Sequence, residues 1–189
     1  MQPVRNVRTK FGEACNGFTL LELMTVMVII FILAVLSVQA YAFLIFRAQG
    51  VTCLNNLRNL YAASTSYVQD YQSWPQISTT NIRDPSYAQA WVSALSPYKI
   101  KAVNWICPSV QRLLGNPDYT QPLNARVDYI ATPFDANPAS PSRYPTQPWY
   151  AETASVHGNG NLMVFANGEV KPLNDVLLDM QQPQTNPPF

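Results

Sequence analysis

The sequence has little charge and almost no histidine. Only 12% of the residues are charged, and 12 basic and 11 acidic side chains leave a formal net charge of +1. Nucleic-acid binding needs a cluster of Lys and Arg against the phosphates, and the absence of any basic stripe argues against such a partner. The single histidine, His157, excludes metal sites built from several histidines. The composition therefore predicts neither a metal nor another cofactor.

Charge, proline and glycine are all missing from one long stretch near the N-terminus. The 24 residues between Glu22 and Arg47 contain none of them, and about 20 apolar residues in a helix suffice to cross a bilayer core. The sequence therefore predicts a transmembrane helix over residues 18–46. Residues 1–17 carry three basic residues against one acidic residue, so the positive-inside rule predicts a cytoplasmic leader and an exported remainder.

Two other kinds of N-terminal segment share features with this stretch. A cleaved secretory signal peptide has an apolar part of about 7–15 residues, shorter than the run found here. An uncleaved membrane anchor without further function remains open.

Glu22 lies just inside the apolar run. A lone carboxylate at the centre of a membrane helix costs about 2.5–3.5 kcal/mol, so its presence indicates a function. The alternative is a side chain that reaches back to the lipid headgroups.

The residues GFTLLEL at 17–23, followed by the long apolar run, resemble the signal of type IV prepilins and type II secretion pseudopilins. The resemblance implies that a prepilin peptidase cleaves after Gly17 and methylates the new amino terminus at Phe18. Glu22, the fifth residue of the mature chain, would meet the Phe18 ammonium of a neighbouring subunit and set the register of a filament. Gln39 stands where many members of the family have a proline, which predicts a straighter helix here.

The same resemblance implies partners and a location. The partners are the prepilin peptidase, other copies or other pilins in a helical filament, an inner-membrane assembly platform and membrane lipid. The protein would cross the bacterial inner membrane once, with a cytoplasmic N-terminus and an extracytoplasmic C-terminal domain.

The helix is expected to continue outside the membrane over residues 47–74. Apolar side chains recur there at spacings of three and four, which is typical of one buried helix face. Proline disfavours helix at the residue before it, so Trp74-Pro75 is expected to end the helix. The expected buried face comprises Leu54, Leu57, Tyr61, Ser64, Val68 and Tyr71, with Asn55, Asn56, Arg58 and Asn59 on the polar sides.

Residues 75–189 contain 15 of the 16 prolines and are expected to form an external domain of short elements. The predicted elements are a helix over 84–96 capped by Asp84, a strand over 127–131 and a Pro- and Ser-rich loop over 133–149. Asn167-Gly168 between two β-prone runs predicts a hairpin over 161–173 with a type I′ turn. The expected fold is α+β and pilin-like, with the long helix packed on a small antiparallel sheet.

The segment from His157 to Gly168 resembles the HxxxxxxxxxDG motif of one subgroup of pilin-like proteins, with Asn167 in place of the aspartate. His157 is expected to hydrogen-bond the hairpin backbone. Cys53 and Cys107 lie on the exported side, where disulfides form, and are a candidate bridge, with two buried free thiols as the alternative. Asp175 and Asp179 are weak calcium candidates and are better explained by a solvated helical turn. The tail beyond Gln181 is expected to be mobile.

These observations predict a structural subunit of a type II secretion-like pseudopilus or a type IV pilus-like filament, and not an enzyme. One alternative is a filament-tip or surface adhesin that binds a ligand through the 133–149 loop and exposed aromatics such as Trp149. A membrane-anchored enzyme is disfavoured because no set of polar residues converges in the sequence.

Overall fold

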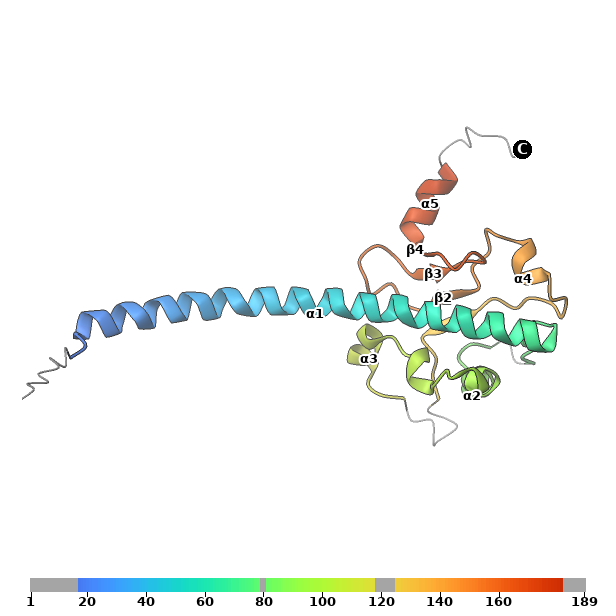
Figure 1. The fold of residues 1–189 in the computed structure, drawn as a ribbon, viewed down its shortest axis with the longest axis horizontal. Helices are drawn as coiled ribbons and strands as arrows, with labels where there is room; N and C mark the ends of the chain where they lie inside the picture. Colours follow the sequence, from blue (N-terminus) through green and yellow to red (C-terminus); the bar gives the residue numbers. More distant parts are fainter. Residues whose placement is uncertain (1–16, 79–80, 118–124, 182–189) are drawn as a thin grey trace, which may run out of the picture. The chain divides into compact units, whose positions relative to one another are not determined.

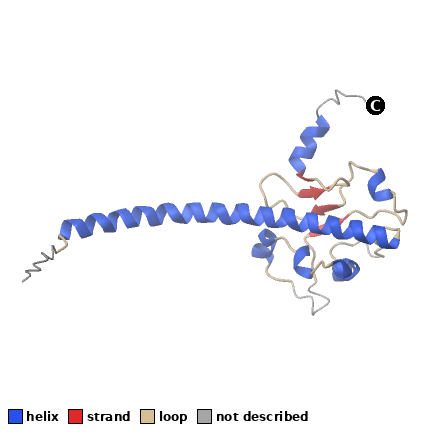
Figure 2. Cartoon of the chain, in the orientation of Figure 1, coloured by secondary structure: helices blue, strands red, loops and turns tan. Residues whose placement is uncertain are grey.

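The computed structural model describes residues 17–78, 81–117 and 125–181. The chain divides into two compact units, residues 1–43 and 44–189. The elements (Figures 1 and 2) are α1 (Leu20–Tyr71), α2 (Pro85–Leu95), η1 (Ser96–Tyr98), η2 (Ala102–Trp105), α3 (Pro108–Leu114), β1 (Tyr129–Ala131), α4 (Ser140–Arg143), β2 (Tyr150–Glu152), β3 (Leu162–Val164), β4 (Val170–Pro172) and α5 (Leu173–Gln181).

Helix α1 begins at Leu20 because Thr19 caps it. The Thr19 hydroxyl accepts a hydrogen bond from the backbone N–H of Glu22 at 3.2 Å, which satisfies one of the free donors at a helix start. Glu22 lies in the first turn, where a negative charge complements the helix dipole. The most apolar 18-residue window of the helix has no buried residue, and by length and composition it is a candidate membrane span.

The second half of α1 carries the domain on one face. The helix ends at Tyr71, three residues before Trp74, because Gln72 takes a positive φ of 52° and turns the chain. Asn56 was expected on the polar side, and this is wrong: its amide donates to the buried carbonyl of Ile106 at 3.1 Å, which makes its burial favourable. The buried face consists of Cys53, Asn56, Leu57, Leu60, Ala63 and Ser64.

The sheet is antiparallel and four-stranded in the order β1-β2-β3-β4. It is fastened to α1 by Ser64, whose hydroxyl lies 2.5 Å from that of Tyr150. Strands of three residues bury too little to be stable alone, so this sheet depends on its packing against the helix. The α+β architecture, with the long N-terminal helix on a small antiparallel sheet, is confirmed.

The core is rich in aromatic side chains, which make up eight of its 21 residues. The Trp74 ring lies 5.1 Å from that of Trp149 and 5.2 Å from that of Phe134, both edge-on. Trp149 was expected to be exposed, and this is wrong: it is only 4% exposed, and its indole N–H donates to the carbonyl of Pro141 at 2.9 Å. The 133–149 loop is therefore folded against the core and contains α4.

The hairpin of β3 and β4 forms, but not with the expected type I′ turn. Only Gly168 has a positive φ, of 77°, while Asn167 does not. The Gly168 N–H donates to the carbonyl of Phe165 at 2.9 Å, and the Phe165 N–H donates to the carbonyl of Glu169 at 3.0 Å. This is the three-residue loop in which a turn is followed by a left-handed glycine.

The smaller sequence predictions have mixed outcomes. Asp84 caps α2 by accepting from the N–H of Ser86 at 2.9 Å, as expected. Asp175 and Asp179 lie on the exposed helix α5, which confirms the solvated helical turn. Strand β1 is shorter than the predicted 127–131. The tail over 182–189 lies outside the described residues.

We expect Gly168→Ala to lower the free energy of unfolding more than Gly158→Ala does. Both glycines have a positive φ, 77° and 84°, which costs an alanine about 1–2 kcal/mol. Only at Gly168 would an added Cβ meet a neighbour, the Tyr61 ring at 3.0 Å. The measurement is the unfolding midpoint of the detergent-solubilised chain, followed by the fluorescence of its buried tryptophans. Equal losses in the two variants would mean that the Tyr61 contact does not constrain the turn.

Candidate functional site

The first candidate site is the cleavage site that the sequence predicts between Gly17 and Phe18. Gly17, Phe18 and Thr19 are not helical, and all three are exposed. Among the residues that the structure describes, nothing lies within 4 Å of the position of an added Cβ at Gly17. The peptide bond between Gly17 and Phe18 therefore lies in an exposed, non-helical segment just before α1, whose first turn contains Glu22.

A second candidate site lies within residues 44–189, where four potential metal ligands come together. Cys53 comes from α1, Cys107 immediately precedes α3, Glu152 ends β2, and His157 lies in the loop between β2 and β3. One ligand atom from each lies within 4.8 Å of the others. His157 Nε2 is 3.5 Å from Cys107 Sγ and 3.2 Å from Glu152 Oε1.

The cluster is closed to solvent. Cys53 and Cys107 are fully buried, and the side chains of Glu152 and His157 are only 1% and 8% exposed. One oxygen of Glu152, Oε2, accepts from the backbone N–H of Leu162 at 3.0 Å. The other oxygen, Oε1, and Nδ1 of His157 have no hydrogen-bond partner. Glu152 Oε1 is therefore close to the imidazole of His157, but no N–H or O–H of the described residues donates a hydrogen bond to it.

The cluster shifts the ionisation of its members in opposite directions. The pKa of the Cys107 thiol is lowered to about 6, mainly because Cys53 hydrogen-bonds its thiolate, with His157 adding a second hydrogen bond. The pKa of Cys53 is raised by the same hydrogen bond to Cys107 and by burial. The side chains of Cys107 and then Glu152, which face the imidazole, raise the pKa of His157 to about 9. The surroundings therefore favour a Cys107 thiolate.

The loop that carries Cys107 is held on both sides. The Cys107 N–H donates to Asp128 Oδ2 at 2.9 Å, and the guanidinium of Arg126 binds the other oxygen of Asp128 at 2.9 Å. On the opposite side, Asn56 of α1 holds the carbonyl of Ile106. Burial raises the pKa of Asp128, against these hydrogen bonds. The position of the Cys107 sulfur is thus fixed by α1 and by the segment that leads into β1.

The sequence interpretation found three of these four residues but assigned them to separate roles. The expected hydrogen bond from His157 to the hairpin backbone is wrong, because Nε2 faces Cys107 and Glu152 and Nδ1 has no partner. Cys53 and Cys107 are free, buried thiols in the structure, and a disulfide between them stays a prediction. Glu152 was missed, and its five-residue separation from His157 is the only local signal that could have indicated it.

Gly168, at the hairpin end of the motif that begins at His157, is held against α1 by Tyr61. The Tyr61 hydroxyl donates to the carbonyl of Ala166 at 2.8 Å, and the Tyr61 ring covers Gly168. His157 and Gly168 therefore lie against α1 near positions 53 and 61, which are separated by about 12 Å along a helix. Asn167, which stands where the motif has an aspartate, accepts from the N–H of Glu169 at 3.0 Å and donates to Glu169 Oε2 at 3.3 Å, so its turn contacts need no charge on this side chain.

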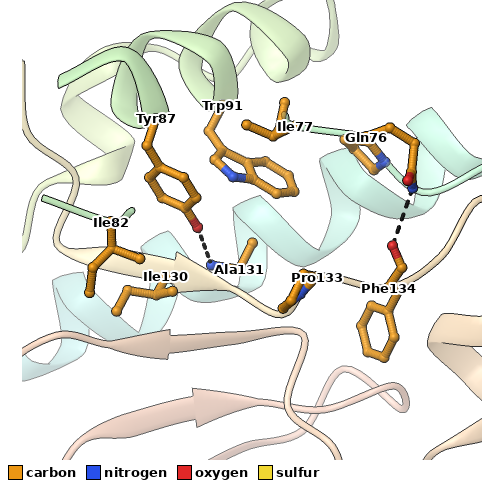
Figure 3. Close-up of a pocket in the computed structure, with 10 residues that line it drawn as sticks. Gln76, Ile77, Ile82, Tyr87, Trp91, Ile130, Ala131, Pro133 and Phe134 are labelled. Carbon is orange, nitrogen blue, oxygen red and sulfur yellow. Dashed lines mark hydrogen bonds between the residues drawn. The ribbon is translucent and has the colours of Figure 1, made fainter. Parts of the chain in front are cut away.

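An apolar pocket of about 160 Å³ is a further candidate site (Figure 3). Two of its polar side chains are already used, because the Tyr87 hydroxyl accepts from the N–H of Ala131 and the Gln76 amide donates to the carbonyl of Phe134. Small-molecule sites usually occupy about 300–1,000 Å³, so this pocket does not support one. It is lined by Pro75, Gln76, Ile77, Ile82, Tyr87, Trp91, Ile130, Ala131, Pro133 and Phe134.

Comparison with known proteins bears on the N-terminal site. Residues 14–38 match the family described as Prokaryotic N-terminal methylation motif. No curated protein and no solved structure matches the chain. The motif indicates a prepilin-like protein, a class of structural subunits that a peptidase processes and that assemble into filaments. Together with the apolar start of α1, it fits anchoring in the inner membrane.

We expect Asn56→Ala to lower the free energy of unfolding by about 1–3 kcal/mol, because it removes the donor of a buried carbonyl. Asn59→Ala is the matched control, since Asn59 lies on the same helix and is exposed, and it should change stability by less than about 0.5 kcal/mol. Thermal unfolding of the full chain in detergent measures both. Similar losses for the two variants would show that the bond to Ile106 does not hold this loop.

Proposed function

We propose that the chain is a structural subunit of a helical filament, either a type II secretion-like pseudopilus or a type IV pilus-like fibre, assembled through its N-terminal helix. The observation that carries this proposal is the methylation motif over residues 14–38, which leads directly into an apolar helix long enough to span a membrane. The small size of the domain over 75–189 favours a pseudopilus over a pilus.

Processing occurs, on this proposal, between Gly17 and Phe18. A prepilin peptidase removes residues 1–17 and methylates the amino group of Phe18. Support comes from the non-helical, exposed conformation of both residues just before α1. The mature chain then begins two residues before the first turn of the helix and carries its ammonium group beside the apolar segment.

Glu22 sets the axial register between subunits. A carboxylate among apolar helices is costly when alone, and an ammonium from a neighbouring chain relieves that cost. Phe18 and Glu22 are four residues apart in one chain, so a neighbour displaced along the filament axis can place its ammonium beside this carboxylate. Apolar packing supplies the association, and the charge pair selects one register from several.

The orientation follows from the basic leader. Residues 1–17 face the cytoplasm, residues 18–46 cross the inner membrane, and residues 47–189 lie outside. The further partners are other pilins of the same filament, membrane lipid and an inner-membrane assembly platform. The adhesin alternative loses its main support, because Trp149 is buried and the 133–149 loop is packed against the core.

We expect Glu22→Gln to reduce incorporation into filaments by more than about 100-fold. The substitution keeps the length of the side chain but leaves the neighbouring ammonium unpaired, which costs about 3–5 kcal/mol for a buried pair. The amount of the subunit in the membrane should not change, since the apolar span is intact. The measurement is the ratio of subunit in sheared filaments to subunit in the membrane fraction.

Glu169→Gln is the matched control for this experiment, because its carboxylate is exposed on the hairpin and should not affect incorporation. If Glu22→Gln and Glu169→Gln both assemble as the unaltered chain does, Glu22 does not set the register.

A further inference from the structure

The assembly mechanism proposed above makes no use of the cluster formed by Cys53, Cys107, Glu152 and His157. Its members come from parts of the chain up to 104 residues apart, yet their ligand atoms lie within 4.8 Å of one another. We propose that these four side chains bind a single divalent transition-metal ion, and that zinc is the ion which fits them best.

The distances agree with a tetrahedral zinc site. Zinc lies about 2.3 Å from sulfur and about 2.0–2.2 Å from nitrogen or oxygen, which places neighbouring ligands about 3.6 Å apart for sulfur and nitrogen and about 3.4 Å apart for nitrogen and oxygen. The corresponding separations here are 3.5 Å from Cys107 Sγ to His157 Nε2 and 3.2 Å from His157 Nε2 to Glu152 Oε1. These two separations are therefore already those of ligands that share one metal ion, and the remaining ligand atoms lie within 4.8 Å.

The orientation of His157 distinguishes a metal site from a catalytic triad. In a triad, the nucleophile and the acid occupy the two different nitrogens of the histidine. Here one nitrogen, Nε2, faces both Cys107 and Glu152, and Nδ1 has no partner. This convergence on a single point is the arrangement that a metal ion requires. The buried Glu152 Oε1, which no hydrogen-bond donor satisfies, would gain the ion as its partner.

The chemistry of the donors selects the ion and the kind of site. Two thiolates with an imidazole suit zinc and similar ions, whereas calcium and magnesium prefer six or more oxygen ligands. Four protein ligands leave no open position for a substrate, so the site is structural rather than catalytic. Asp128 and Asn56, which fix the loop of Cys107, support the ligands from outside.

The bound ion would cross-link α1 to three other parts of the domain. It would join the helix at Cys53 to the start of α3, the end of β2 and the loop that precedes β3. A disulfide between Cys53 and Cys107 would use the same two sulfurs but would leave Glu152 and His157 outside the bond. The two states are therefore mutually exclusive and can be separated by experiment.

The test is metal binding by the full chain in detergent, purified without oxygen and with its thiols reduced. We expect it to take up one Zn²⁺ per chain. Bound Co²⁺ should give the absorption of a tetrahedral site with thiolate ligands, and Zn²⁺, but not Mg²⁺, should raise the unfolding temperature. Because no filament is needed, this result is independent of the proposed function.

Cys53→Ser, Cys107→Ser, His157→Ala and Glu152→Gln should each weaken Zn²⁺ binding by more than about 100-fold, beyond the usual effect of a supporting residue. The matched controls are Cys15→Ser, outside the described residues, and Glu169→Gln, an exposed carboxylate; both should bind as the unaltered chain does. If a variant fails to fold, Zn²⁺ uptake by the unaltered chain still tests the proposal. A reduced chain that takes up no Zn²⁺, or that binds it equally well without these ligands, overturns the proposal.

Discussion

The packing of the domain against one face of α1 is the interaction on which the rest of the structure depends. The helix is apolar on all sides in its first half and apolar on one side in its second half. One continuous element is therefore a candidate membrane span at one end and packs against a protein core at the other. The four strands have only three residues each. Without the buried face that runs from Cys53 to Ser64, the sheet would have nothing to cover it.

The attachment of the sheet to the helix is concentrated at a few polar points within an aromatic core. Ser64 meets Tyr150 of β2, Tyr61 meets Ala166 of the hairpin, and the Asn56 amide lies 3.4 Å from the hydroxyl of Tyr129 in β1. Such directed contacts fix the register of the short strands against the helix, which apolar packing alone leaves free to slide. The proposed metal ion would add a fourth attachment next to Asn56, where α1 enters the domain.

Local patterns predicted the elements of this chain better than its contacts. The apolar helix, the Asp84 cap and the β3–β4 hairpin each depend on neighbouring residues, and all three form, although the hairpin has a different turn from the one expected. Asn56 and Trp149 were misplaced because their burial depends on partners 50 and 8 residues away that no local pattern identifies. The cluster at His157 was missed for the same reason, since the fold alone brings residues 53, 107 and 152 together. The turn at Gly168 shows that Asn-Gly favours tight hairpins without fixing their loop length.

The central claim is that a prepilin peptidase converts this chain into a filament subunit whose first residue is Phe18. The most direct measurement is the intact mass and N-terminal sequence of the chain after coexpression with a prepilin peptidase. The account predicts loss of residues 1–17 and one methyl group on the amino terminus of Phe18. An uncleaved leader, or a mature chain that begins at any other residue, would contradict it.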